Sequence, residues 1–408
     1  MARRTSRVPL CFRRNVVNLS KSHVILKKGR ERSLLNRHPW IFSGAIQTLP
    51  QFEDGQLLPV MSSSGEMLCT AYVNRASSIT ARVVAWVDED AHTALRKNFE
   101  AAWALRRALV DFQRTNAYRL INAEGDGIPG LIVDVYAGVA VMQIGTLGAE
   151  RLRDFFIEQI REKIQPLAIL ERSLLPSRAE EGLSDCEKVH FGSVPAEIEI
   201  LENGVRCIVS FEHAQKTGFF LDQREMRALV ETLARGRNVL NCFSFSGAFS
   251  VFAARGGARA TMSVDVSKGA IELAQRNLAL NHFTREQHRC VAADVFEFLR
   301  TQGGGYDLII LDPPAFAKKK AHIAQAAKGY NDINRVAMEK ISPGGIIVTC
   351  SCSHFVDEDL FRKIIFSAAR DAGRKVRIVH KHRQAFDHPV SVFHPEGEYL
   401  KGLVLAVD

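Results

Sequence analysis

After Gly236 the chain alternates between short apolar segments and longer amphipathic ones, and this rhythm restricts the fold more than any other feature of the sequence. Such alternation predicts parallel strands joined by crossover helices. We therefore expect an α/β domain with a Rossmann-like sheet. Its strands are expected near residues 238–243, 260–265, 289–293, 306–311 and 345–350, followed by a final pair near 375–379 and 402–407.

The first part of the chain has a different pattern. From Val24 to about Val87 short strand patterns alternate with turn signals, which predicts a small β-barrel. Within it, Arg37 and Trp40 place a basic residue beside an aromatic one, a combination that clamps or stacks nucleic acid in many proteins but also occurs in ordinary cores.

The middle of the chain is expected to be α+β. Apolar spacing predicts helices over residues 88–115 and 149–163, and Asn203-Gly204 between alternating apolar residues predicts a hairpin. Residues 172–196 are polar, and we expect a long surface loop there.

The net charge of +9 is concentrated at the N-terminus, because residues 1–32 carry ten Lys or Arg and one acid. Such a block fits a solvated extension, a transit peptide or a nucleic-acid-binding arm, and we expect residues 1–23 to be a basic, disordered extension. No apolar run reaches the roughly 18 residues of a membrane span. The eight cysteines are scattered without a Cys-x-x-Cys pair, which favours a reducing, cytoplasmic setting and no metal site.

Three successive expected strands end in an acid, namely Asp265, Asp294 and Asp312. Each acid alone is equally well explained as a helix N-cap. Together, at the carboxyl ends of neighbouring strands, they favour a ligand with ribose hydroxyls and a positive charge. The Gly-x-Gly-x-x-Gly pattern of a dinucleotide site is missing, and S-adenosylmethionine fits, with its ribose at Asp265, its adenine at Asp294 and its amine near Asp312.

Two motifs point to the reacting base. Asp-Pro-Pro-Ala-Phe at 312–316 is similar to the motif with which amino-methylating enzymes hold an exocyclic amino group, so Pro313 and Phe316 are expected to contact a base. The apolar run that ends in Cys350, Ser351 and Cys352 favours a different chemistry. Carbon 5 of cytosine becomes nucleophilic only after a thiolate attacks carbon 6, which requires a cysteine in the pocket.

Cys350 and Cys352 point to the same face of an extended strand, and Cys352 lies further beyond the expected strand end. Cys352 is thus the thiol nearer the expected crevice, although two small buried thiols in a strand explain the pair equally well. We expect Asp312 as a catalytic group. A free thiol is only a few per cent ionised at neutral pH, so a nearby positive charge is needed. His354, Lys216 and the cofactor's sulfonium are the candidates.

Five segments together resemble the bacterial 23S rRNA cytosine-5 methyltransferase I family over roughly Val24 to Asp408. They are residues 27–44, 215–224 (Gln-Lys-Thr-Gly-Phe-Phe-Leu-Asp-Gln-Arg), 239–247, 329–334 and 351–353.

The resemblance implies an N-terminal PUA RNA-binding barrel (24–90), a central α+β domain (91–211) and a class I methyltransferase domain (212–408). It implies a homodimer that acts on naked or partly assembled large-subunit rRNA, with Cys352 as the nucleophile. Cofactor contacts are implied at Ser246, Gly247 and the three strand-end acids, and we expect them also at Phe220 and Asn241. Lys216 and Arg224 of the matching segment are expected to contact RNA.

Two other functions fit the same residues. One is an RNA N-methyltransferase that uses the Asp-Pro-Pro-Ala-Phe motif and does not need Cys352. The other is a non-catalytic RNA-binding or ribosome-assembly protein that keeps the fold but takes up no S-adenosylmethionine.

Overall fold

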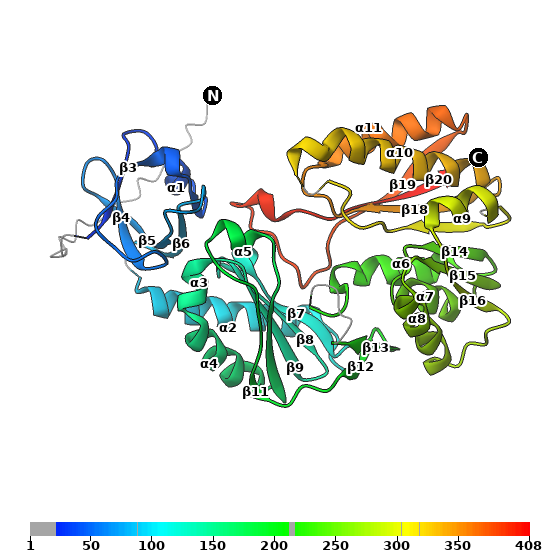
Figure 1. The fold of residues 1–408 in the computed structure, drawn as a ribbon, viewed down its shortest axis with the longest axis horizontal. Coiled ribbons are helices and arrows are strands. Elements are labelled where there is room, and N and C mark those ends of the chain that lie inside the picture. The colour runs from blue at the N-terminus through cyan, green and yellow to red at the C-terminus, as the bar shows by residue number, and fades with distance from the viewer. Residues whose placement is uncertain (1–21, 88, 212–216, 303, 318) are drawn as a thin grey trace, which may run out of the picture.

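The computed structural model describes residues 22–87, 89–211, 217–302, 304–317 and 319–408, and the predicted N-terminal extension lies almost wholly outside these ranges. Three main sheets follow one another along the chain, with six, five and seven strands, and a separate two-stranded hairpin lies between the last two (Figure 1). None of the helices in the described ranges has the length and apolar character needed to cross a membrane.

The first sheet confirms the β-rich module predicted from Val24 onward. Its strand order is β2-β6-β5-β4-β1-β3, and buried side chains such as Leu58, Val60 and Val83 form its own core. Its elements are β1 (Val24–Leu26), α1 (Arg32–Leu35), β2 (Trp40–Ile41), η1 (Ser43–Ala45), β3 (Ile46–Thr48), β4 (Leu57–Met61), β5 (Met67–Val73) and β6 (Ala81–Trp86).

The second sheet has the order β11-β10-β9-β8-β7, and helices α2 and α4 pack against it through Phe99 and Phe156. Asp90 begins α2 by accepting a hydrogen bond from the backbone N–H of Thr93, as expected of an N-cap. The elements are α2 (Ala91–Leu109), β7 (Ala117–Asn122), η2 (Ala123–Asp126), β8 (Leu131–Tyr136), β9 (Val139–Ile144), α3 (Leu147–Arg151), α4 (Arg153–Ile164), β10 (Ala168–Ser173), α5 (Ser177–Glu180) and β11 (Cys186–Gly192).

The prediction of a long loop over residues 172–196 was wrong. The segment contains α5 and the edge strand β11, which pairs antiparallel with β10. Because β11 is an edge strand with most of its residues exposed, it lacks the apolar alternation that marks a strand with one buried face. The predicted hairpin is confirmed as β12 (Glu197–Glu202) and β13 (Val205–Ser210), with positive φ angles at Asn203 and Gly204.

The third sheet confirms the predicted strand and helix alternation. Its order is β16-β15-β14-β17-β18-β20-β19, in which β14 to β18 are parallel to one another and β20 is antiparallel to both of its neighbours. Its elements are η3 (Leu221–Gln223), α6 (Arg224–Leu233), β14 (Asn238–Cys242), α7 (Ala248–Arg255), β15 (Ala260–Asp265), α8 (Lys268–Leu280), β16 (His288–Ala292), α9 (Val295–Gln302), β17 (Leu308–Leu311), η4 (Lys320–His322), α10 (Ile323–Lys340), β18 (Gly345–Ser351), α11 (Glu358–Asp371), β19 (Val376–His382), η5 (Pro395–Gly397) and β20 (Lys401–Val407).

The segment between β19 and β20 extends from the third sheet toward the other two parts of the chain (Figure 1). His394 of this segment lies edge-on to Trp40 of the first sheet at 4.4 Å, and the backbone N–H of Arg119 in β7 donates to Asp387 at 2.8 Å. One segment therefore contacts all three sheets.

The first sheet also packs tightly on α3. An added Cβ at Gly148 would lie 2.0 Å from Cγ of Tyr72, whereas one at Gly145 would meet no atom closer than 3.5 Å. We predict that Gly148→Ala destabilises the full chain by about 1–3 kcal/mol, because the ring of Tyr72 must move away from α3 to make room for the added methyl group. Urea unfolding checks it, with Gly145→Ala as the matched control; equal stability of the two variants would contradict the packing.

Candidate active site

The turn that joins β14 to α7, residues 243–247, is held in an unusual backbone conformation. Phe243, Phe245 and Gly247 have φ angles of +57°, +46° and +73°. The N–H of Phe245 donates to Asp265 Oδ2 at 2.9 Å, which ties the turn to the end of β15. Non-glycine residues rarely adopt positive φ, so this turn has a conformation that its surroundings must maintain.

Asn241 and Ser244 supply polar atoms beneath this turn. The amide of Asn241 donates to Ser250 Oγ at 3.0 Å, but its Oδ1 and the hydroxyl of Ser244 are buried without hydrogen-bond partners in the described part of the chain. Unpaired buried polar atoms are costly, and a polar ligand that reaches them removes the cost. The residues here therefore fit a polar cofactor at the carboxyl end of β14.

The strand register places two of the three predicted acids on either side of this turn. Cys242 pairs with Val264 on one side and with Leu311 on the other, so Asp265 and Asp312 each come one residue later, level with position 243. Asp265 accepts from two backbone N–H groups, one on each oxygen, and still has lone pairs for a ligand hydroxyl.

Asp312 and Asp294 have different surroundings. Asp312 Oδ1 accepts from Gln223 Nε2 at 3.0 Å. Asp294 is exposed, and its Oδ1 accepts from the N–H of Glu297 at 2.9 Å. It therefore acts as the N-cap of α9, which was the alternative explanation for this acid.

The two cysteines of β18 differ in burial. Cys350 is completely buried in a cluster with Met226 and Val348. Burial, and after it the charge of Asp312, raises the pKa of the Cys350 thiol well above its ordinary value. Cys352 lies one residue beyond the strand, is partly exposed, and has its Sγ 4.0 Å from the carbonyl oxygen of Pro313.

Cys352 lies between two anchored serines. The hydroxyl groups of Ser351 and Ser353 each lie 3.0 Å from that of Tyr330, and the N–H of Ala317 donates to Ser353 Oγ at 3.3 Å. The ring of Phe316 packs on Tyr330 at 4.6 Å between centroids. The Asp-Pro-Pro-Ala-Phe segment and the end of β18 are thus held together.

Lys401 also lies at this site, and the sequence interpretation missed it. It is opposite Ser351 in the β18–β20 pair, and its Nζ donates to the carbonyl oxygens of Ser353 and Tyr399, both at 2.7 Å. Tyr399 in turn donates to Asp222 Oδ2 at 2.6 Å. Residues 395–402, which include Lys401, resemble the C-terminal loop of the family, but nothing in that stretch indicates a role for the lysine.

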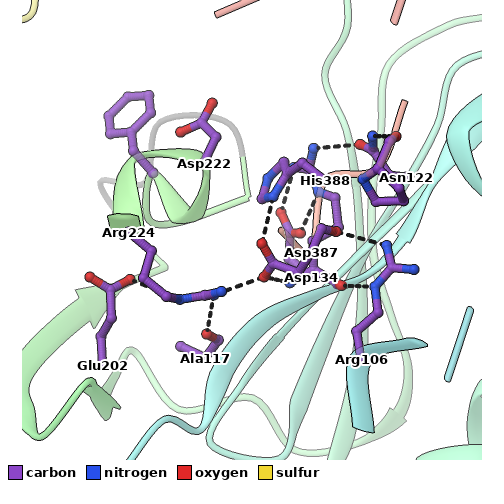
Figure 2. Close-up of polar contacts among 12 residues, drawn as sticks. Arg106, Ala117, Asn122, Asp134, Glu202, Asp222, Arg224, Asp387 and His388 are labelled. Carbon is purple, nitrogen blue, oxygen red and sulfur yellow. Dashed lines mark hydrogen bonds and ion pairs between the residues drawn. The ribbon is translucent and has the colours of Figure 1, made fainter. Parts of the chain in front are cut away.

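A contact between Arg224 and RNA would require this residue to lie at the surface. Arg224 instead lies in a buried ion-pair network. The residue is 5% exposed, and its Nη2 donates to Asp387 Oδ2 at 2.8 Å and to the carbonyl oxygen of Ala117 at 2.9 Å (Figure 2). His388 lies 2.8 Å from the other oxygen of Asp387. Although burial raises the pKa of Asp387, His388 and Arg224 lower it well below its ordinary value.

Phe220 lies near the turn after β14, whereas Trp40 and Arg37 lie in the first sheet and its loops. Phe220 packs edge-on to Phe245 at 5.3 Å, beside the turn after β14. Trp40 donates from Nε1 to Glu124 at 2.8 Å and is partly buried, while Arg37 is exposed with its guanidinium 4.9 Å from the ring of Trp86. Lys216 lies outside the described residues.

Ser246 and Gly247 complete the turn. The carbonyl oxygen of Ser246 accepts from Asn277 Nδ2 at 2.8 Å. An added Cβ on Gly247 would lie 2.7 Å from Cβ of Ala274 in α8. The turn therefore needs glycine both for its positive φ and for its approach to α8.

Known families and proteins match most of this chain. Residues 156–390 match a family model described as S-adenosylmethionine-dependent methyltransferase, and residues 24–86 match one described as a PUA-like domain. Proteins named ribosomal RNA large subunit methyltransferase I are similar over nearly the whole length. The protein from Shewanella denitrificans is 42% identical over 94% of this chain and 98% of its own, and that from Alteromonas mediterranea is 38% identical over 95% and 99%.

Two solved structures are similar in fold and sequence. One, a protein from Streptococcus mutans assigned as a SAM-dependent methyltransferase, has a TM-score of 0.81 and 26% identity, and the match covers 94% of this chain and all of that one. The other, assigned as a methyltransferase and solved in complex with SAH, has a TM-score of 0.81 and 27% identity with the same coverage.

We predict that Gly247→Ala weakens the binding of S-adenosylmethionine by about tenfold or more, because an L-residue in this conformation costs roughly 1–2 kcal/mol and its Cβ meets α8. Isothermal titration calorimetry measures the affinity. Gly269→Ala is the control, since a Cβ there meets nothing within 4 Å. An unchanged Kd for Gly247→Ala would exclude this turn from the cofactor site.

We predict that Arg224→Met lowers the free energy of unfolding by about 3–5 kcal/mol, because Asp387 and Glu202 lose a buried partner. Arg235→Met, at an exposed position just after α6, should change it by less than about 0.5 kcal/mol. A variant of Arg224 with normal stability but weakened RNA binding would restore the role expected from the sequence.

Proposed function

Since the chain belongs to the ribosomal RNA large subunit methyltransferase I family and is an S-adenosylmethionine-dependent rRNA methyltransferase, we propose that it methylates carbon 5 of one cytosine in 23S rRNA. The reaction proceeds through a covalent bond between Cys352 and carbon 6 of the base. The boundaries 24–90, 91–211 and 212–408 are proposed for its three domains.

The observation that carries the proposal is the contrast between the two thiols of β18. Cys350 is buried in the core, whereas Cys352 extends beyond the strand beside the Asp-Pro-Pro-Ala-Phe segment, 4.0 Å from Pro313. Only an accessible thiol next to the base-holding segment is of use to a pyrimidine methyltransferase, and N-methylation requires none.

In the proposed reaction, the Cys352 thiolate donates an electron pair to carbon 6, and carbon 5 becomes an enamine carbon. When bound, S-adenosylmethionine supplies the methyl group that this carbon takes up. Loss of the carbon 5 proton to a base then allows the C6–S bond to break, and its electron pair returns to Cys352 as thiolate. A flipped-out base is required, at an unstacking cost of a few kcal/mol.

The other residues of the site hold the two reactants. Asn241, Ser246, Gly247, Asp265 and Phe220 surround the β14–α7 turn and are proposed as cofactor contacts, with Asp294 at the next strand end. Asp312 is proposed to hold the cofactor's amine next to the base, and Pro313 and Phe316 to contact the base itself.

Large-subunit rRNA, naked or partly assembled, is the proposed substrate, and a homodimer the proposed functional state. The PUA-like domain supports an RNA partner, and Arg37 at its exposed surface is a proposed contact. Trp40 is better explained by its bond to Glu124, which fixes the domain to η2. Lys216 remains a proposed RNA contact.

We predict that Cys352→Ala lowers methyl transfer to 23S rRNA by at least about a thousandfold, because no other described thiol is placed to attack carbon 6. Cys350→Ala, its neighbour on the strand, should keep activity within about threefold. Transfer of labelled methyl groups, with bisulfite mapping of the product, measures both.

The rival functions give different results in the same assay. An active Cys352→Ala variant whose product carries the methyl group on an exocyclic nitrogen would identify an N-methyltransferase. A wild-type protein that binds rRNA but no S-adenosylmethionine in calorimetry would be a non-catalytic assembly factor.

A further inference from the structure

Lys401 contacts the backbone of the short segment that carries the predicted nucleophile. It is level with Ser351, the residue before Cys352, and its Nζ reaches the carbonyl oxygen of Ser353, the residue after it. The ammonium group therefore lies at the backbone carbonyl that directly follows Cys352. Within the described part of the chain, two of the three ammonium donors have acceptors, on Ser353 and Tyr399.

The charge of Lys401 is coupled to that of Cys352. Burial lowers the pKa of the Lys401 ammonium to about 8, while the opposite charges of Cys352 and Asp357 act to raise it. Below that pH the lysine carries its positive charge in a half-buried site, where a charge interacts more strongly with its neighbours than in water. Cys350 and Tyr330, two titratable groups of the described chain that also interact with Cys352, are neutral in that range because burial raises the pKa of each.

Lys401 is held by a chain of contacts that also reaches the cofactor side of the site. It donates to the carbonyl oxygen of Tyr399, whose hydroxyl donates to Asp222. The next residue, Gln223, donates to Asp312. The position of the ammonium group is thus fixed relative to the acid that we assign to the cofactor and the base.

We propose that the Lys401 ammonium stabilises the thiolate of Cys352 and so makes it a nucleophile at neutral pH. This inference rests on the proposed function. The thiol loses its proton to solvent, the electron pair that remains on sulfur forms the bond to carbon 6, and the same charge stabilises the thiolate when that bond breaks. Lys401 thus acts through Cys352 as a positioning residue and touches neither the base nor the cofactor.

His354, one of the charges considered from the sequence, is less suited to this role. It is exposed and packs edge-on to Phe355 at 5.5 Å. At an exposed position the surrounding water weakens the effect of its charge on a neighbouring thiolate.

The test is the pH dependence of alkylation of Cys352 by iodoacetamide in the full-length protein, followed by mass spectrometry that separates Cys352 from Cys350. Lys401→Gln keeps an N–H donor for the carbonyl oxygens but removes the charge. We predict that it raises the midpoint of alkylation by about one pH unit, which lowers the rate at pH 7 by about tenfold. Lys401→Arg should restore most of the difference.

Lys381→Gln is the matched control, because Lys381 lies on the adjacent strand β19 and is exposed with Glu358 as its partner. It should leave the midpoint unchanged. Should Lys401→Gln fail to fold, the wild-type protein still decides the matter, since its midpoint must lie below that of the same thiol in the urea-denatured chain.

The outcomes separate this inference from the function on which it rests. A folded Lys401→Gln variant with a wild-type midpoint, together with an inactive Cys352→Ala variant, overturns the role of Lys401 alone. An active Cys352→Ala variant overturns the covalent mechanism itself, whatever the alkylation shows.

Discussion

Parallel pairing of β15, β14, β17 and β18 is the constraint on which the site depends, because it brings four carboxyl strand ends to one edge of the sheet. Register then decides what meets there. Asp265 and Asp312 come level on either side of the turn after β14, and Cys352 follows two positions beyond the residue level with Asp312. If β18 were shifted by one residue, Ser351 would occupy the buried position of Cys350, and Ser353 would occupy the accessible position of Cys352.

The antiparallel strand β20 adds a basic residue, Lys401, to the site at the end of β18. It lies between β18 and β19 and begins with Lys401 at the level of Ser351. The segment that leads into it contacts the first sheet through His394 and the second through Asp387. Buried ion pairs such as Arg224–Asp387 contribute little net stability when complete but are costly to break, so they fix the segment in one position. The position of Lys401 is therefore linked to the packing of all three sheets.

The strands of the third sheet could be predicted because buried parallel strands are continuous apolar runs, and their polar ends marked Asp265, Asp312 and Cys352 directly. β11 could not, since an exposed edge strand carries no such pattern. The burial of Arg224 could not be predicted for a different reason. Its partners, Ala117 and Asp387, lie 107 and 163 residues away along the chain, and no local pattern indicates that a basic residue beside a turn will be buried. Lys401 was overlooked for the same reason, since its contact with Ser353 joins residues 48 positions apart in the chain.

The covalent step can be observed directly with rRNA in which cytosine is replaced by 5-fluorocytosine. Fluorine at carbon 5 cannot leave as a proton does, so the bond to carbon 6 should persist after methyl transfer. We predict a covalent protein–RNA complex that forms only with S-adenosylmethionine and whose cross-linked peptide carries the base on Cys352. Efficient methylation of the normal RNA without any such complex, or a cross-link on Cys350, would contradict the account.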